Sequence, residues 1–189
     1  MYLRIEEDSM DIKLIINELV FGNAQRAMKN LYMYYYPKLV LFVSYYVKSK
    51  EDAEEIVSDT FYAVWEQRDK LSHIQNFNTY IYAIAKNHAF DFLKHKGKND
   101  LHFIQQDDEE AVLVSTSSNP ETNLISKELL DRLNAAIESL PAQNKIAFKL
   151  VREMKLKYKE AATIMGISVK TLEAHVTSAM KRLVKILDE

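Results

Sequence analysis

Three side chains in the middle of the sequence have the spacing of a metal site. His88, Asp91 and His95 fall at i, i+3 and i+7, so a helix would bring two imidazoles and a carboxylate, all zinc ligands, to one side. A fourth ligand at suitable spacing is missing, and the neighbouring Lys side chains would repel a cation. We therefore expect no metal here. A metalloenzyme would instead hold stoichiometric metal and lose its activity in a His95→Ala variant.

Motifs of other catalytic classes are missing as well. The sequence has no Gly-rich phosphate loop, no HExxH motif and no nucleophile elbow. It also has no Cys, which removes thiolate ligands and cysteine nucleophiles. These absences predict a protein that is not an enzyme and takes neither a cofactor nor a small-molecule substrate.

Aromatic and basic side chains lie together in a predicted helix over 79–96 and beside it. The rings stand at its start and the basic groups at its end: Phe77, Tyr80, Tyr82, Lys94, His95, Lys96 and Lys98. Rings beside positive charge suit single-stranded nucleic acid, because each base offers a face for stacking and each phosphate a charge. Some of these rings must also fill a hydrophobic core.

The segment 158–187 predicts two helices joined by a tight turn at Gly166. Glycine adopts the left-handed conformation that ends a helix at no steric cost, and Ser168 is placed to cap the next helix. Ala162 is small enough to let the helices approach, and Leu172 reaches back into their shared core. This spacing is typical of a helix-turn-helix DNA-binding motif. An ordinary helical hairpin is the alternative.

The second of these helices has an apolar stripe and a polar, basic face. The stripe, predicted to pack inward, contains Val169, Leu172, Val176, Ala179, Leu183 and Ile186. The outward face contains Lys170, Thr171, Glu173, Ala174, His175, Thr177, Ser178, Lys181, Arg182 and Lys185. Short side chains allow close approach to base edges in a major groove, and Lys or Arg meets phosphate.

A predicted helix over 51–67 combines a buried stripe with an acidic face. The stripe contains Ala53, Ile56, Val57, Phe61, Val64 and Trp65. Opposite it lie Glu55, Ser58, Asp59, Tyr62 and Glu66. Taken alone, such a face is either a solvated surface or a docking surface for a basic partner protein.

Composition and charge indicate the domain organisation. The 189 residues include three Gly and three Pro and are 48% hydrophobic, which favours helical domains over a sheet. Net charge is -2, but twelve Lys and Arg face eight Asp and Glu from Thr122 onward. We predict an all-α fold with two helical domains, residues 1–96 and 122–189, joined by a flexible acidic linker over 97–121. Neither a secretory signal nor a spanning apolar run is visible, so we expect a cytoplasmic protein.

Turn-forming residues predict where the front helices begin and end. Ser9 and Asn23 are the expected caps of the first two helices, and Pro37 is expected to break or kink the second. Asn78 is the expected cap of the helix over 79–96.

Two motifs follow one another in the chain. The first is DAEEIVSDTFYAVWEQ followed by NFNTYIYAIAKNHAFDFLKHK, and the second is LLDRLNAAIESLPAQNKIAFKLVREMKLKYKEAATIMGISVKTLEAHVTSAMKRL. In this order, with a spacer between, they closely resemble regions two and four of the sigma-70 family of RNA polymerase sigma factors, in its extracytoplasmic-function (ECF) group. The tyrosine-rich front and the ending KTLEAHVTSAMKRL resemble the Bacteroidetes branch.

The resemblance implies a promoter-specificity subunit that directs transcription initiation, and it implies partners. Core RNA polymerase would bind through its beta-prime coiled coil and its beta flap, promoter DNA would be recognised and opened, and an anti-sigma factor would be a further partner. Contacts to the polymerase are expected from Glu55, Ser58, Asp59 and Tyr62.

DNA contacts are implied in two places. At the minus-ten element, a pocket for an extruded base and contacts to adjoining nucleotides would use Asn76, Phe77, Asn78, Tyr80, Lys86, Asn87 and Lys94. At the minus-thirty-five element the contacts would be Ser168, Lys170, Thr171, Glu173, Ala174, Thr177, Ser178, Lys181 and Arg182.

The recognition helix departs from many relatives, which are richer in Arg there. This chain offers Glu173 and His175, so strong readout of guanine is not expected, and Glu173 could accept from cytosine. Weak DNA binding by the isolated protein is expected, with polymerase tethering both domains to the promoter. The alternative is a stand-alone helix-turn-helix transcriptional regulator, which would bind a palindromic operator without polymerase.

Overall fold

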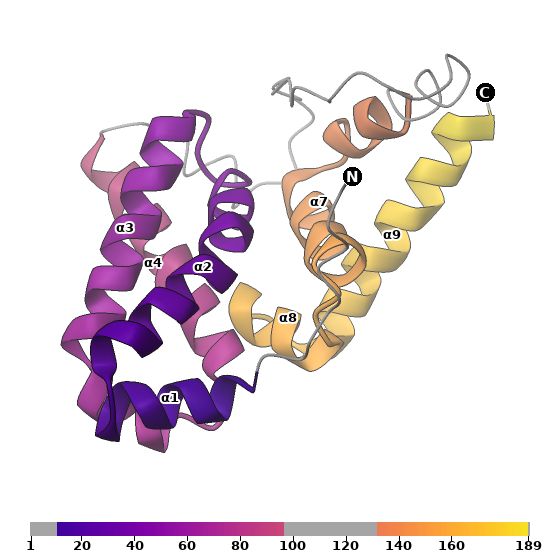
Figure 1. The fold of residues 1–189 in the computed structure, drawn as a ribbon. Helices are drawn as coiled ribbons and strands as arrows, with labels where there is room; N and C mark the ends of the chain where they lie inside the picture. Colours follow the sequence, from indigo (N-terminus) through magenta and orange to yellow (C-terminus); the bar gives the residue numbers. More distant parts are fainter. Residues whose placement is uncertain (1–10, 97–131, 189) are drawn as a thin grey trace, which may run out of the picture.

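The computed structural model describes residues 11–96 and 132–188, and every regular element within these ranges is helical (Figure 1). The predicted all-α fold class is confirmed. The linker predicted over 97–121 lies outside the described residues, and the domain boundaries stay a prediction. Within the described ranges, no helix combines the length and the apolar character that crossing a membrane requires.

The N-terminal part is a bundle of four α-helices with a 3-10 turn. Its elements are α1 (Ile12–Phe21), α2 (Ala24–Val43), α3 (Lys50–Glu66), η1 (Arg68–His73) and α4 (Phe77–His95). Each α-helix begins at a polar cap whose side chain accepts a hydrogen bond from a backbone N–H of the first turn: Asp11, Asn23, Ser49 and Asn76. Rings fill much of the core, where Tyr35 and Phe42 are fully buried.

Three predicted boundaries in this part are wrong. Ser9 lies outside the described residues, and α1 is capped by Asp11 instead. Pro37 does not break α2, which continues through it from Ala24 to Val43, whereas a kink at this position stays a prediction. The helix tolerates the proline because Pro37 and Met33, whose carbonyl loses its helical partner, are both exposed residues. The fourth helix begins at Phe77 rather than Thr79, because Asn76, not Asn78, accepts from the Thr79 amide at 3.0 Å.

The C-terminal part contains the predicted helix-turn-helix. Residues 132–138 are helical, and the elements that follow are α7 (Ala142–Phe148), the π-helical turn η3 (Lys149–Glu153), α8 (Tyr158–Met165) and α9 (Val169–Asp188). Gly166 has φ +75°, and the amides of Gly166 and Ile167 both donate to the Ala162 carbonyl. This is the left-handed helix ending for which glycine is suited.

The stripe of α9 is buried only in its middle. Leu172, Val176, Ala179 and Leu183 are at most 4% exposed. Val169 and Ile186, predicted inside, are 40% and 38% exposed. The prediction is wrong at both ends, because neither residue belongs to the hydrophobic clusters in which the middle of α9 packs.

The two parts pack directly against each other through α4 and α8 (Figure 1). One cluster of buried hydrophobic residues extends from α1 to α9 and includes Ala85 of α4 and Ile164 of α8. The described structure is therefore a closed arrangement, in which the helix-turn-helix lies against the N-terminal bundle.

Candidate polymerase and nucleic-acid interface

The acidic face of α3 is open to solvent. The buried side of the helix holds Ala53, Ile56, Val57, Thr60, Phe61 and Val64. On the opposite side Glu55, Ser58 and Asp59 are exposed, and Tyr62 is 62% exposed. The Tyr62 hydroxyl donates to Glu66 at 2.9 Å, which favours one orientation of the exposed ring. All four residues predicted to bind a protein partner thus lie on one accessible face.

His88, Asp91 and His95, which have the spacing of a metal site, line a groove between α3 and α4. It has a volume of about 460 Å³ and is lined by Ile56, Asp59, Tyr62, Ala63, Glu66, Gln67, His88, Asp91, Phe92 and His95. Lys94 Nζ lies 3.6 Å from Asp91 Oδ1, so this carboxylate already has a cationic neighbour. Among the described residues, no group of three His, Asp or Glu side chains could hold a metal ion.

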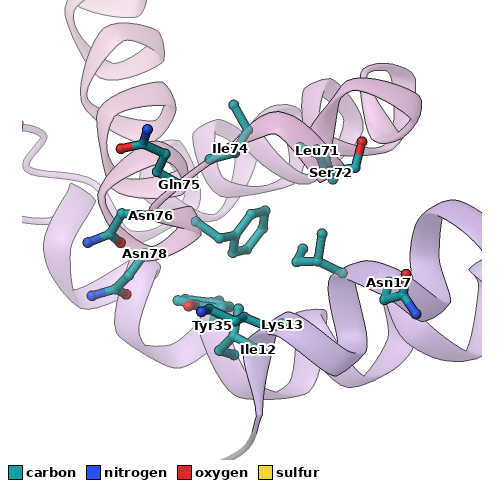
Figure 2. Close-up of a pocket in the computed structure, with 12 residues that line it drawn as sticks. Ile12, Lys13, Asn17, Tyr35, Leu71, Ser72, Ile74, Gln75, Asn76 and Asn78 are labelled. Carbon is teal, nitrogen blue, oxygen red and sulfur yellow. The ribbon is translucent and has the colours of Figure 1, made fainter.

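A larger pocket lies where α4 begins (Figure 2). Its volume is about 640 Å³, and its lining comes from α1, Tyr35 of α2, η1 and the start of α4. Figure 2 shows Asn76 and Asn78 on one side of this space and Asn17 of α1 on the other. Phe77 also lines it, but the ring is only 6% exposed and packs edge-on against Tyr35, with centroids 5.7 Å apart.

The structure brings only part of the predicted minus-ten set into this pocket. Asn76, Phe77 and Asn78 line it, whereas Tyr80, Lys86, Asn87 and Lys94 do not. Several lining residues were not predicted: Ile12, Lys13, Ile16, Asn17, Tyr35, Leu71, Ser72, Ile74 and Gln75. No sequence signal places α1 beside α4, because more than fifty residues separate these two walls.

The remaining minus-ten residues follow α4 away from the pocket. Asn87 and Lys94 are exposed, and Tyr80 is half-buried. Lys86 is also half-buried, and its Nζ lies 3.8 Å from the point where a Cβ would stand on Gly166. Partial burial lowers the pKa of Lys86. This lysine therefore faces the turn of the helix-turn-helix.

Polar contacts join the two parts, and one of them involves a residue that lines the pocket. Asn76 Nδ2 donates to Glu160 Oε1 of α8 at 2.8 Å. The Tyr45 hydroxyl donates to Glu153 at 3.1 Å, and Lys149 Nζ lies 4.6 Å from the centre of the Tyr45 ring. In the closed arrangement, two residues predicted to hold DNA, Asn76 and Lys86, thus face the C-terminal part.

Most of the predicted outward face of α9 is accessible, whereas His175 and Ser178 are half-buried against α7. Ser168 Oγ accepts from the Thr171 amide at 3.0 Å, which caps the helix and fixes its first turn. Lys170, Thr171, Glu173, Ala174, Thr177, Lys181 and Arg182 are exposed, and Ser178 is half-buried. The face combines short side chains with two cations at its far end, a composition that suits a DNA groove and its phosphates.

Models of one protein family match both the N-terminal and the C-terminal part of the chain. Models of Sigma-70 region 2 and of Sigma-70, region 4 match residues 31–99 and 130–183. The ECF RNA polymerase sigma-E factors of Salmonella typhimurium and Escherichia coli are each 29% identical over 174 residues, covering 89% of this chain and 91% of theirs. The chain belongs to the ECF group of the sigma-70 family. RNA polymerase sigma factor NccH of Alcaligenes xylosoxydans xylosoxydans is 25% identical to this sigma factor over 138 residues, which covers 73% of this chain and 74% of NccH.

Solved structures share the fold of this sigma factor. CnrH in complex with the cytosolic domain of CnrY matches with a TM-score of 0.63 and 20% identity, covering 93% of this chain and 96% of that one. RpoE from Bartonella quintana, solved with the anti-sigma factor NepR, matches with a TM-score of 0.60 and 23% identity, covering 85% and 96%. The predicted family is confirmed, while the Bacteroidetes branch and the individual site residues stay predictions.

Proposed function

We propose that this sigma factor binds core RNA polymerase, recognises and opens promoter DNA, and so directs transcription initiation in the cytoplasm. It acts as a specificity subunit and has no catalytic activity of its own. The observation that carries the proposal is the combination, on one chain of this family, of a solvent-open acidic helix face, a polar-edged pocket and an exposed helix-turn-helix face. The tyrosine-rich front supports placing it in a Bacteroidetes-like branch.

The pocket at the start of α4 is the proposed site for a base extruded from the minus-ten element. Extrusion costs a few kcal/mol, which stacking and hydrogen bonds in a pocket must offset. The amides of Asn76 and Asn78 offer both donors and acceptors to the edge of a base. Asn87 and Lys94 are exposed on the same helix and are proposed to hold adjoining nucleotides.

The closed arrangement adds a condition to strand binding. Asn76 Nδ2 is engaged by Glu160, and Lys86 lies under the turn at Gly166. Movement of α8 away from α4 would free the Nδ2 donor of Asn76 from Glu160 and would uncover Lys86. Polymerase, which we propose holds region two through its beta-prime coiled coil and region four through its beta flap, would favour that separation. An anti-sigma factor of the kind solved with RpoE is a further proposed partner.

Charge reversal on α3 tests the proposed docking face. Asp59→Lys should weaken binding to core RNA polymerase about tenfold, because it places a cation where a basic partner surface is expected. Asp69→Lys makes the same charge change at an exposed acidic residue of η1, outside the docking face, and should leave the affinity unchanged. Fluorescence titration of labelled protein with core polymerase measures both variants, and equal affinity for Asp59→Lys and wild type would remove Asp59 from the interface.

Transcription in vitro tests the function as a whole. Core polymerase with this protein and a library of promoter fragments should start transcripts that core polymerase alone does not make. If transcripts and start sites are the same with and without the protein, the proposed function is wrong. If the protein alone selects a palindromic sequence, the stand-alone regulator is the correct interpretation.

A further inference from the structure

A buried amide joins α7 to the outward face of α9. Asn144 is 7% exposed and lies between two side chains of α9, and the two helices lie side by side (Figure 1). Its Nδ2 donates to Ser178 Oγ at 3.1 Å, and its Oδ1 lies 2.7 Å from His175 Nδ1. Both ends of the amide are therefore satisfied, as a buried polar group requires.

With the Asn144 amide oxygen facing Nδ1, this contact favours the neutral His175 tautomer that carries its proton on Nδ1. An amide oxygen only accepts, so the hydrogen bond requires the proton to be on Nδ1. In the neutral ring, Nε2 is then unprotonated and acts as an acceptor. His175 is half-buried and lies four residues after Thr171 and three before Ser178, at the edge of the exposed face of α9.

An acceptor on a groove-reading helix has few partners in DNA. In the major groove the donors are the exocyclic amino groups, N6 of adenine and N4 of cytosine, whereas guanine and thymine present acceptors there. Phosphate oxygens accept as well, so an unprotonated Nε2 makes no hydrogen bond to the backbone. The ring therefore has the chemistry to distinguish A and C from G and T.

We propose that His175 is a specificity-determining residue of the minus-thirty-five interface, an inference that rests on the proposed function. Its Nε2 accepts a hydrogen bond from the amino group of an adenine or cytosine. Asn144 is its positioning residue. It does not touch DNA, but it holds the ring in place and keeps the proton on Nδ1. The readout thus depends on a buried side chain of another helix.

Base analogues test the contact itself. Holoenzyme is assembled from the full chain and core polymerase on a promoter that it transcribes, and each A or C of the minus-thirty-five element is replaced in turn by purine or 2-pyrimidinone, which lack only the amino group. At one position the analogue should weaken wild-type binding about fivefold, the value of one hydrogen bond. His175→Ala holoenzyme should not distinguish analogue from natural base at that position. If His175→Ala weakens all duplexes equally, the ring makes no base contact and the proposal is wrong.

An Asn144→Asp substitution tests the role of the buried amide. A carboxylate accepts from His175 Nδ1 and from the Ser178 hydroxyl, and its charge favours the imidazolium, which makes Nε2 a donor. The preferred base at the position found above should shift from A or C towards G or T. A purely structural Asn144 would instead weaken binding to all four bases alike, and that result overturns its positioning role.

Different results would contradict the proposed function and the role of His175. A holoenzyme that does not form, or starts no transcripts, overturns the proposed function and this assignment with it. A holoenzyme that transcribes normally but shows no coupling between His175 and any amino group overturns this assignment alone. Since His175 is half-exposed, His175→Ala is expected to fold, so the analogue experiment decides the matter even if Asn144→Asp is unstable.

Discussion

Asn76 performs two functions that a single substitution can separate. Its Oδ1 accepts from the Thr79 amide at 3.0 Å and caps α4, while its Nδ2 donates to Glu160 Oε1 at 2.8 Å and joins α4 to α8. Asn76→Asp keeps an oxygen for the cap and replaces the donor by a second carboxylate beside Glu160. The helix should remain intact, because Asp is as good a cap as Asn and its charge favours a helix N-terminus.

The size of the effect follows from two terms. The lost hydrogen bond, at an exposed site, is worth about 1 kcal/mol. Two carboxylates about 4 Å apart in water repel each other by about 1 kcal/mol more. Together these terms should shift the equilibrium between the closed arrangement and separated parts about 30-fold towards separation. Asn76→Ser keeps the cap and loses the hydrogen bond without adding charge, so it should produce about half of this free-energy change.

Spin labels measure the shift directly. The chain contains no Cys, so single Cys residues introduced at exposed Asp69 and Lys181 can be labelled selectively. Pulsed dipolar spectroscopy should give one narrow distribution of label-to-label distances for the labelled parent. The labelled Asn76→Asp variant should show a broad population of distances, because its two parts separate. Raising the salt concentration should reduce the difference between the Asp and Ser variants, because it screens the repulsion. Identical distributions for all three proteins would refute the argument that this contact helps to hold α8 on α4.

Three further substitutions test the fold and the pocket. Phe77→Ala should lower the free energy of unfolding by about 3 kcal/mol, because a buried ring that packs on Tyr35 is lost. In the folded fraction, permanganate footprinting should show promoter opening reduced more than duplex binding, and equal losses would contradict a role of Phe77 in promoter opening. Gly166→Ala should destabilise by about 1 kcal/mol in urea unfolding because φ is +75°, while the added Cβ would meet Lys86 Nζ at an ordinary contact distance of 3.8 Å. No change in stability would show that the turn relaxes. Burial raises the pKa of Glu138, but its hydrogen bonds to Lys149 and Lys145 outweigh this effect and hold the pKa below its usual value. The contribution of Glu138 to folding stability is therefore present at neutral pH and is lost as the pH falls. Glu138→Gln should therefore lower stability by about 1 kcal/mol at neutral pH and by progressively less as the pH falls below the usual carboxyl pKa, whereas destabilisation that does not change with pH would exclude the ion pairs as the cause.

Local features of the chain were predictable because their physics is local. The turn at Gly166 needs one residue with positive φ, and the cap at Ser168 needs one oxygen three residues before an amide. The two faces of α3 follow from a period of 3.6 residues in an uninterrupted helix. Each of these features depends on neighbours within one or two helical turns, so the sequence alone specified them.

Predictions were wrong where the outcome depends on surroundings. The effect of Pro37 depends on whether it falls on the buried or the exposed side of the helix, and in α2 both Pro37 and Met33, four residues before it, are exposed. Asn76 and Asn78 are equally good caps by residue type. In the structure Asn76 caps α4, and Phe77, the first residue of the helix, is buried against Tyr35. The exposure of the proline and the packing of Phe77 both depend on distant parts of the chain, so neither can be read from the few residues nearby.

The sequence by itself determined the family, the all-helical fold, the accessible face of α3 and the helix-turn-helix, because these rest on periodicity, caps and motif order. Only the tertiary structure decided that α1 supplies a wall of the pocket, that Asn76 binds Glu160, and that Asn144 lies in hydrogen-bond contact with His175. These pairs lie 31 or more residues apart. Their contact follows from how whole helix faces are buried together, and a buried polar group takes whichever partner that packing brings within reach.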